Sequence, residues 1–543
     1  MRTPVARRLL TVLAAALLLP FLVATSHGGT SEFCTTFAPS TGEVGECDTD
    51  GATSRLRQNP QAPFTGFEPT MQSGPEGDLY YATTSTPGVA VGFKAGVARS
   101  TDGGASWADV TPTLNGRTVP PETNDPYVYV DPWTGRVFSF HMAPILLCSI
   151  LSFSDDQGAS WTTNPVGCGP TGVWDHQTIV AAPPTAGVET LGYDNVLVQC
   201  VNAIYAAMCA RSLDGGLTWA NGVPAYVNTF GAQQGSLCGA QHGHLASEAD
   251  GTIYLPTSEC GTVPVVYISR DSGLTWERSQ VSTRRMPFQD PTVAVDAAGT
   301  IHVAYQDRDG VLWMASSTDD GATWSDEVRI TPPGTIGTKP AMVAGDAGRV
   351  AIAYPGTDDV ASFGAIPGLS ADERARIVWG GFWTVTDSAG QPDATFTTVE
   401  ATGADPLMRG NACDGGGRCT FQVDFIEATL TPDGQVWASF SDGCVAACVA
   451  NPTGTNDAGS VGHAVAVTIP LDLLDLCDAT CSRFEGAEVA AGTRTDARAP
   501  LRVETLSSLD ELPPAWEAQV RALRDAPQLA AERLSWASGD AQR

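Results

Sequence analysis

Ser100-Thr-Asp102-Gly-Gly104-Ala-Ser106-Trp107 is the first of five copies of one eight-residue frame. The other copies begin at Ser154, Ser212, Ser269 and Ser317, and all five read Ser-x-Asp-x-Gly-x-Ser/Thr-Trp. Ser and Asp side chains bond to turn backbone, Gly permits positive φ, and the hydroxyl residue and Trp open the next strand. Each frame therefore predicts a β-hairpin with an aromatic anchor. The frame aspartates are Asp102, Asp156, Asp214, Asp271 and Asp319.

A second repeat precedes the frames and consists of two alternating strands around a glycine turn. Its clearest copy runs from Asp290-Pro291 through Gly299 to Tyr305. The other copies begin at Glu68, Asp125, Asp175, His242, Lys339 and Asp424. The two motifs together make a four-stranded unit, and the units predict an all-β, seven-bladed β-propeller over residues 62–472. Six blades are the alternative. A strand at 464–469 and N-terminal residues are expected to close the ring.

The five frames resemble the Asp-box, or bacterial neuraminidase repeat, of a β-propeller superfamily that includes sialidases and polysaccharide-degrading enzymes. The resemblance implies that each box joins the third and fourth strands of a blade, on the side away from the ligand-binding mouth. The box aspartates are therefore expected to be structural. A degenerate sixth copy is expected between Thr386 and Phe396. The stretch Arg409–Cys419 also looks like an exported, sialidase-like subgroup of this superfamily.

The sialidase pattern itself is not met. Where that family places an arginine on the first blade, this sequence has Glu68, and a carboxylate repels an anionic substrate. The family's tyrosine nucleophile is missing as well, because the last tyrosine is Tyr354, inside an expected strand of the sixth unit. We therefore expect no exo-sialidase activity.

Carboxylates and imidazoles stand at the start of the units, where the blades of a propeller converge on the mouth. The catalytic candidates are Asp175, His176, His242, His244 and Asp290, and the candidate ligand-binding residues are Glu68, Asp125 and Asp424. Carboxylates with histidine suit general acid/base chemistry on a neutral sugar or binding of a divalent cation. The competing interpretation is structural, because an Asp before Pro caps turns and bonds to neighbouring backbone.

The net charge of −30 argues against nucleic acid as a partner. Arg7 and Arg8 precede an apolar run to Ala24, which predicts a signal peptide over residues 1–26 and no membrane span after its removal. The protein is therefore expected to be secreted or to lie on the exterior of the cell envelope. An N-terminal exported segment is assigned to residues 27–61.

All 14 cysteines follow the signal and form close pairs in sequence, which predicts structural disulfides between neighbours. The expected pairs are Cys34–Cys47, Cys148–Cys168, Cys200–Cys209, Cys238–Cys260, Cys413–Cys419, Cys444–Cys448 and Cys477–Cys481. Residues 473–543 are expected to form a disulfide loop and a short helical tail, with Trp516, Val520 and Leu523 on one helical face.

Three functions remain open. The first is a binding propeller whose central mouth recognises an extracellular glycan or protein. The second is a glycoside hydrolase or polysaccharide lyase that uses the Asp/His ring, and the third is an envelope scaffold. A divalent cation is the one cofactor that the ring could hold; no other cofactor is expected.

Overall fold

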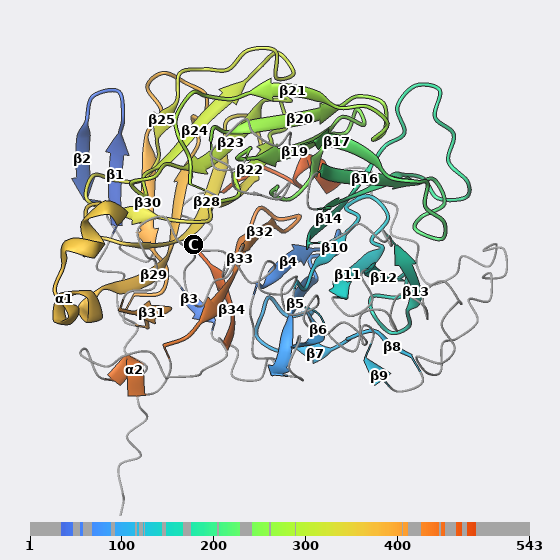
Figure 1. Cartoon of the computed structure of the whole chain (residues 1–543), viewed down its shortest axis with the longest axis horizontal. Helices are drawn as coiled ribbons and strands as arrows, with labels where there is room; N and C mark the ends of the chain where they lie inside the picture. The colour runs from blue at the N-terminus through green and yellow to red at the C-terminus, as the bar shows by residue number, and fades with distance from the viewer. Residues whose placement is uncertain are drawn as a thin grey trace, which may run out of the picture.

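The computed structural model describes residues 34–46, 55–57, 68–87, 93–114, 117–118, 123, 125–143, 148–166, 175–203, 206–227, 242–259, 262–287, 289–403, 405–410, 425–444, 447–450, 463–469 and 475–484. They form antiparallel sheets arranged around an axis (Figure 1). The predicted signal peptide, helical tail and Asp424 lie outside these residues, as does the side chain of Asp175.

Five four-stranded sheets follow one another along the chain, each a simple meander. Sheet 1 contains β4 (Thr70–Ser73), β5 (Leu79–Pro87), β6 (Phe93–Ser100) and β7 (Ala108–Asp109). Sheet 2 contains β10 (Val128–Val130), β11 (Val137–Ala143), β12 (Cys148–Ser154) and β13 (Thr162–Val166). Sheet 3 contains β14 (Asp175–Ala182), β15 (Val196–Asn202), β16 (Ala206–Ser212) and β17 (Val223–Val227). Sheet 4 contains β18 (Ala246–Ser247), β19 (Ile253–Thr257), β20 (Val265–Ser269) and β21 (Glu277–Gln280). Sheet 5 contains β22 (Thr292–Val295), β23 (Ile301–Gln306), β24 (Leu312–Ser317) and β25 (Val328–Arg329). A short hairpin, β8 (Thr113–Leu114) and β9 (Arg117–Thr118), stands apart from them.

The large sheet has eight strands and carries the N-terminal hairpin on its edge. Its strands are β1 (Cys34–Ala38), β2 (Glu43–Glu46), β26 (Ile336–Gly337), β27 (Ala341–Ala344), β28 (Val350–Thr357), β29 (Val378–Thr386), β30 (Phe396–Glu400) and β31 (Met408–Arg409). The insertion between β28 and β29 holds the 3-10 helix η1 (Phe363–Gly368) and α1 (Ala371–Arg376). A capping box at Ser370 and Glu373 starts α1.

The closing sheet joins the two ends of the propeller. It contains β32 (Glu427–Leu430), β33 (Val436–Asp442), β34 (His463–Thr468) and the N-terminal β3 (Arg55–Arg57). Arg55 pairs with Thr468 and Arg57 with Ala466, so the predicted closure by N-terminal residues and the strand at 464–469 is confirmed. α2 (Ala447–Ala450) and η2 (Ser482–Phe484) complete the described elements.

The sheets contact one another in a closed circle. The inner strands β4 and β10 contact each other, as do β14, β18, β22, β27 and β32 in turn, and β32 returns to β4; between sheets 2 and 3 the contact is made by β11 with β14. The predicted all-β propeller is therefore confirmed. The six four-stranded sheets match the six-bladed alternative. The predicted number of seven blades is not confirmed, because the β27–β28–β29–β30 run belongs to an eight-stranded sheet.

One hydrogen bond recurs between neighbouring inner strands and aligns them. The Val128 N–H donates to Thr70 Oγ1 (2.9 Å), Leu245 N–H to Thr178 Oγ1 (2.9 Å), and Met342 N–H to Thr292 Oγ1 (3.2 Å). Apolar side chains fill the space between sheets, for example Phe138 and Leu151 of sheet 2 against Leu197 of sheet 3. The sheets therefore keep one register around the ring, so equivalent residues of the repeats come to equivalent places.

The five boxes share one hydrogen-bond pattern. In the first box Ser100 Oγ donates to Asp102 Oδ1 (2.9 Å), and the Gly104 N–H donates to Ser100 Oγ (2.9 Å). The Ser106 N–H and hydroxyl donate to the two oxygens of Asp102 (2.8 and 2.6 Å). These donors, the Ser106 hydroxyl first, lower the pKa of Asp102 to about 2. The same bonds recur in the other four boxes.

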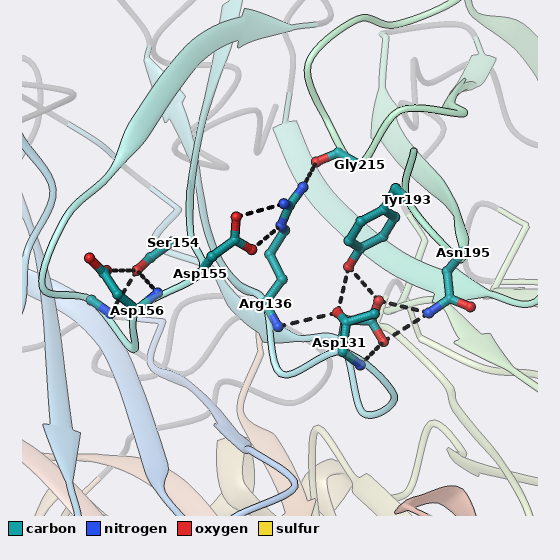
Figure 2. Close-up of polar contacts among 10 residues, drawn as sticks. Asp131, Arg136, Ser154, Asp155, Asp156, Tyr193, Asn195 and Gly215 are labelled. Carbon is teal, nitrogen blue, oxygen red and sulfur yellow. Dashed lines mark hydrogen bonds and ion pairs between the residues drawn. The ribbon is translucent and has the colours of Figure 1, made fainter. Parts of the chain in front are cut away.

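Box residues also join neighbouring sheets, as Figure 2 shows for sheets 2 and 3. Arg136 donates to both carboxylate oxygens of Asp155 in the second box (2.6 and 2.7 Å) and to the carbonyl of Gly215 in the third (2.7 Å). Asp131 of sheet 2 accepts from Tyr193 and Asn195 of sheet 3. Because strand direction alternates within a sheet, the boxes lie at the opposite end from the residues that precede each inner strand.

Three of the predicted disulfides fall on described residues and are confirmed: Cys200–Cys209, Cys444–Cys448 and Cys477–Cys481. Cys200 and Cys209 are direct partners on β15 and β16. Cys34 is also disulfide-bonded, while its predicted partner Cys47 lies outside the described residues. The degenerate sixth box forms the turn between β29 and β30, where Gly390 has a φ of +81° and lies against Ser316 of sheet 5.

Candidate functional site

The aligned inner strands define two layers of side chains at the mouth. Each sheet contributes one residue to the outer layer. That residue lies two positions before Thr70, Thr178 or Thr292, or before the residue equivalent to these threonines in the other sheets. It comprises Glu68, Asp125, His176, His242, Asp290 and Lys339. The inner layer, two residues further along, includes Tyr127 and His244 as equivalents of the threonines. In the closing sheet, Phe425 and Glu427 precede Gly434 by the same spacing as Asp290 and Thr292 precede Gly299.

Two imidazole–carboxylate pairs connect sheets that are not neighbours in the ring. His176 Nδ1 of sheet 3 lies 3.1 Å from Asp290 Oδ2 of sheet 5. His244 Nδ1 of sheet 4 contacts Glu427 Oε2 of the closing sheet. Side chains of non-adjacent sheets can meet in this way only across the axis, so the structure brings these four residues together at the centre of the mouth.

Aromatic side chains fill the space between the pairs. The ring of Phe425 lies edge-on to His176 and to His244, with centroids 5.7 and 4.8 Å away. Tyr127 contacts His244 in the same geometry, at 4.8 Å. Burial raises the pKa of the Tyr127 hydroxyl well above its ordinary value, and the nearby Glu427 carboxylate adds to this effect.

His242 is the most buried of the described candidates, and its side chain has no exposed surface. Its Nδ1 lies 2.9 Å from the Gly243 carbonyl, and Nε2 has no hydrogen-bond partner among the described residues. Burial lowers the pKa of His242 to about 3, with the neighbouring imidazoles His176 and His244 contributing in the same direction. The ring is therefore neutral near pH 7. With its proton on Nδ1, it presents an acceptor at Nε2.

Two buried carboxylate oxygens, like His242 Nε2, lack a hydrogen-bond partner among the described residues. Asp290 Oδ2 and Glu427 Oε2 each lie close to an imidazole, but neither makes a hydrogen bond of acceptable angle within the part of the chain that the structure describes. A short distance at an unfavourable angle gives electrostatic attraction without satisfying the lone pairs. The cluster thus holds three buried acceptor atoms, His242 Nε2, Asp290 Oδ2 and Glu427 Oε2, that a hydrogen-bond donor could satisfy.

Asp125 differs from these residues because its hydrogen bonds are structural. Its Oδ2 accepts the backbone N–H of His176 (3.1 Å), and its carbonyl accepts the Thr123 hydroxyl (3.0 Å). The first bond joins sheet 2 to sheet 3, which is the structural use of an Asp before Pro that the sequence offered as the competing interpretation. Asp125 nevertheless holds the backbone of His176 in place.

Three outer-layer residues have a left-handed backbone: Glu68 (φ +48°), His176 (φ +52°) and Lys339 (φ +49°). All three side chains are almost wholly buried. Sequence reasoning selected the first two and missed Lys339, although Lys339-Pro340 opens the sixth unit. It also missed Tyr127, Phe425 and Glu427, whose only signal was their place in the repeat.

Among the described residues, no group of three or more His, Cys, Asp or Glu is arranged to hold a metal ion. Within the same residues, no helix is long and apolar enough to span a membrane. Tyr354 lies in the core of the large sheet, where it stacks on Phe382 with centroids 5.6 Å apart. Tyr354 is therefore part of the hydrophobic core.

Comparison with known proteins agrees with the architecture. Residues 199–355 match the family model of the BNR repeat-like domain. Among solved structures, the Hadza microbial sialidase Hz136 is similar over 66% of this chain and 69% of its own, at 17% identity and a TM-score of 0.41. A protein of unknown function from Dyadobacter fermentans is similar over 77% of this chain and 99% of its own, at 13% identity and a TM-score of 0.41.

The GH93 α-L-arabinofuranosidase of Fusarium graminearum is similar over 78% of this chain and 98% of its own, at 12% identity and a TM-score of 0.39. At these TM-scores the likenesses carry no information on activity. No curated protein matches the sequence. The five boxes, the ring of sheets and the match of residues 199–355 to the BNR repeat-like domain agree with the expected Asp-box β-propeller.

Proposed function

We propose that this protein binds a neutral oligosaccharide at the axial mouth, outside the cell. The observation that carries the proposal is the set of three buried acceptors, His242 Nε2, Asp290 Oδ2 and Glu427 Oε2, on side chains gathered at the axis from three sheets. Sugar hydroxyls are donors of the kind that these atoms lack. Tyr127 and Phe425 pack against His244 beside these acceptors and supply the apolar side chains that accompany polar groups in sugar sites.

The carboxylates of the two layers, Glu68, Asp125, Asp290 and Glu427, outnumber the cations Lys339 and Arg483 near them, and this surplus favours a neutral ligand over an acidic one. The carboxylates of Asp290 and Glu427 would repel the carboxylate of sialic acid or a uronate. A neutral His242 would not offset this repulsion, because burial lowers its pKa to about 3. Glu68 in the outer layer supports the same choice.

The experiment is a binding screen of the purified protein against neutral oligosaccharides of hexoses and pentoses, with oligogalacturonate and 3′-sialyllactose as acidic comparisons. The His242→Leu variant removes one acceptor and keeps a buried side chain of similar bulk. It is expected to bind a neutral ligand about tenfold more weakly, the effect of one buried hydrogen bond. Preference for the acidic sugars would contradict the proposal.

The matched control is His302→Leu. His302 is also fully buried, but it bonds to Ser316 Oγ (2.8 Å) and Asp296 Oδ2 (3.2 Å) within sheet 5, near the turn remote from the mouth. This variant is expected to lose stability and to keep the affinity of the wild type. Equal losses of affinity in both variants would mean that His242 acts only through the fold.

A second candidate function is hydrolysis or lysis of the bound glycan. The His176–Asp290 pair favours it, because a carboxylate 3.1 Å from an imidazole nitrogen can orient the ring and raise its basicity. The test is the appearance of new reducing ends, or of an unsaturated product absorbing in the ultraviolet, from whichever oligosaccharide binds. Turnover that is abolished by Asp290→Asn would establish an enzyme, and binding without turnover would leave a binding propeller.

A further inference from the structure

The closing sheet cannot contain a box of the kind found in sheets 1 to 5. Each of those boxes joins the third and fourth strands of its sheet, as Ser100–Trp107 joins β6 to β7. In the closing sheet the third strand is β34 and the fourth is β3, and these strands come from opposite ends of the chain. No box can connect them, and a different segment lies at this place.

Residues 475–484, which we call the strap, take the place of that box. In sheet 2, Arg136 lies in the turn between β10 and β11 and donates to the carbonyl of Gly215 in the box of the next sheet (2.7 Å; Figure 2). In the large sheet, Arg349 lies in the equivalent turn between β27 and β28 and donates to the carbonyl of Asp475 in the strap (2.8 Å). The strap therefore accepts from the same arginine of the repeat as a box does.

The strap bonds to both of the sheets that meet at this point. On the large sheet, the Asp346 N–H donates to the Leu476 carbonyl (2.8 Å), and the Asp478 N–H donates to Asp346 Oδ2 (2.8 Å). On the closing sheet, the Cys481 N–H donates to the carbonyl of Pro432, in the turn between β32 and β33 (3.0 Å). The strap thus ties the turn of the large sheet to the turn of the closing sheet.

The strap is connected to the mouth through β32. This strand runs from Glu427, which contacts His244 at the axis, to Leu430, and the turn held by the strap follows directly. Leu430 and Phe484 of the strap belong to one buried cluster. Burial lowers the pKa of Arg483 in the strap, and the nearby Glu427 carboxylate opposes this effect. The strap therefore holds one end of β32 and places a cation near the other.

We propose that the strap replaces the box that the closing sheet cannot have and, by holding β32, positions Glu427 in the mouth. The inference rests on the proposed function for the ligand, and it adds the segment that positions one of the three acceptors. A box is tied to its sheet by the two strands that it joins. The strap depends on its bonds to two turns, so its displacement should loosen β32.

Two variants displace the strap without changing a residue of the mouth. Arg349→Met removes the side-chain bonds to the strap. Gly345→Ala would place a Cβ against the carbonyl of Leu476, so the strap would have to move. The matched control is Arg136→Met, which removes the equivalent bond at an intact box together with two cation–π contacts. It shows whether lost stability alone loosens an inner strand.

Hydrogen exchange followed by mass spectrometry measures the opening of β32 in the two variants and of β14 in the control. Binding of the neutral oligosaccharides of the screen measures the state of the mouth. We expect the β32 amides to exchange about tenfold or more faster in Arg349→Met and in Gly345→Ala. The affinity of both variants should fall about tenfold, the effect of one misplaced acceptor. In Arg136→Met, β14 should exchange at the wild-type rate.

Unchanged exchange of β32 in either variant would overturn the inference, because the strap would then not hold this strand. Equal acceleration of β14 in Arg136→Met would also overturn it, by assigning the effect to lost stability. Faster exchange of β32 with full affinity would overturn the link to the mouth. Failure of the wild type to bind any oligosaccharide would overturn the proposed function, whereas exchange would still decide whether the strap holds β32.

Discussion

The contact between Gly104 and Trp437 gives a quantitative test of ring closure. Gly104 belongs to the first box, and Trp437 lies on β33 of the closing sheet. A Cβ at position 104 would lie 2.8 Å from Cη2 and 3.1 Å from Cζ3 of that indole. The indole is buried with Met71, Leu79 and Tyr81. It therefore cannot swing into solvent to make room for a methyl group.

Two costs apply to Gly104→Ala. The φ of +75° places alanine in the left-handed region, which costs about 1–2 kcal/mol. Packing a methyl group against the buried indole costs about a further 1–3 kcal/mol. The expected loss in the free energy of unfolding is therefore about 2–5 kcal/mol.

Gly77→Ala is the matched control. Gly77 has a φ of +84°, and nothing lies within 4 Å of a Cβ built there. This variant should lose only the backbone term, about 1–2 kcal/mol. Guanidinium unfolding of both variants, followed by circular dichroism, measures the difference. Equal losses would refute the reasoning, because they would mean that sheet 1 and the closing sheet do not pack through this contact.

Three further predictions concern acid stability, the disulfides and activity. Burial lowers the pKa of His242 to about 3, so that, as the pH falls, this residue takes up a proton in the unfolded chain before it does so in the folded chain. The stability that depends on the neutral ring is therefore complete above about pH 6.5 and is lost as the pH falls toward 3. Unfolding measured across that range should show that His242→Gln reduces the slope of the unfolding free energy against pH by about 1.4 kcal/mol per pH unit. An unchanged slope would mean that another group takes up the proton. Replacing Cys477 and Cys481 together by serine should lower the free energy of unfolding by ~2 kcal/mol, because the unfolded chain gains the entropy of the opened loop. Guanidinium unfolding measures this loss, and no loss would show that the bridge does not form. An aryl sialoside should release no sialic acid, because Glu68 stands where an arginine is needed; release that is lost in Asp290→Asn would contradict this.

The repeats made the fold predictable because their chemistry is local. The Ser and Asp of each box bond within eight residues, so the five hairpins could be read from the sequence without knowledge of the rest. The closing strand at Arg55–Arg57 was expected only in general terms, because three residues carry little pattern of their own. The hairpin β1–β2 on the edge of the large sheet was not predicted, since strand addition depends on which edge is free.

The positions of the candidate residues could be predicted from the repeats, whereas their pairing could not. His176, His244 and Asp290 were selected because repeat starts converge on an axis, and the structure does bring them together. The partner of His244 is Glu427, which lies beyond the expected Asp424. A spacing pattern did not single out Glu427, because its pairing with His244 depends on the register of β32. The left-handed backbone of Lys339 likewise leaves no mark in composition.

The pairing of Arg55 with Thr468 has a consequence for the order of folding. Synthesis delivers β3 among the first strands and β34 among the last, so the first strand has no partner until almost all of the sheets have been made. If β3 has not joined when β34 forms, the outer edge of β34 is exposed and could pair with another chain. Contacts that join distant parts of a chain form slowly. Truncation before Arg57 should therefore harm the yield of monomer more than it harms the sheets themselves, and a chaperone that covers this edge would act late.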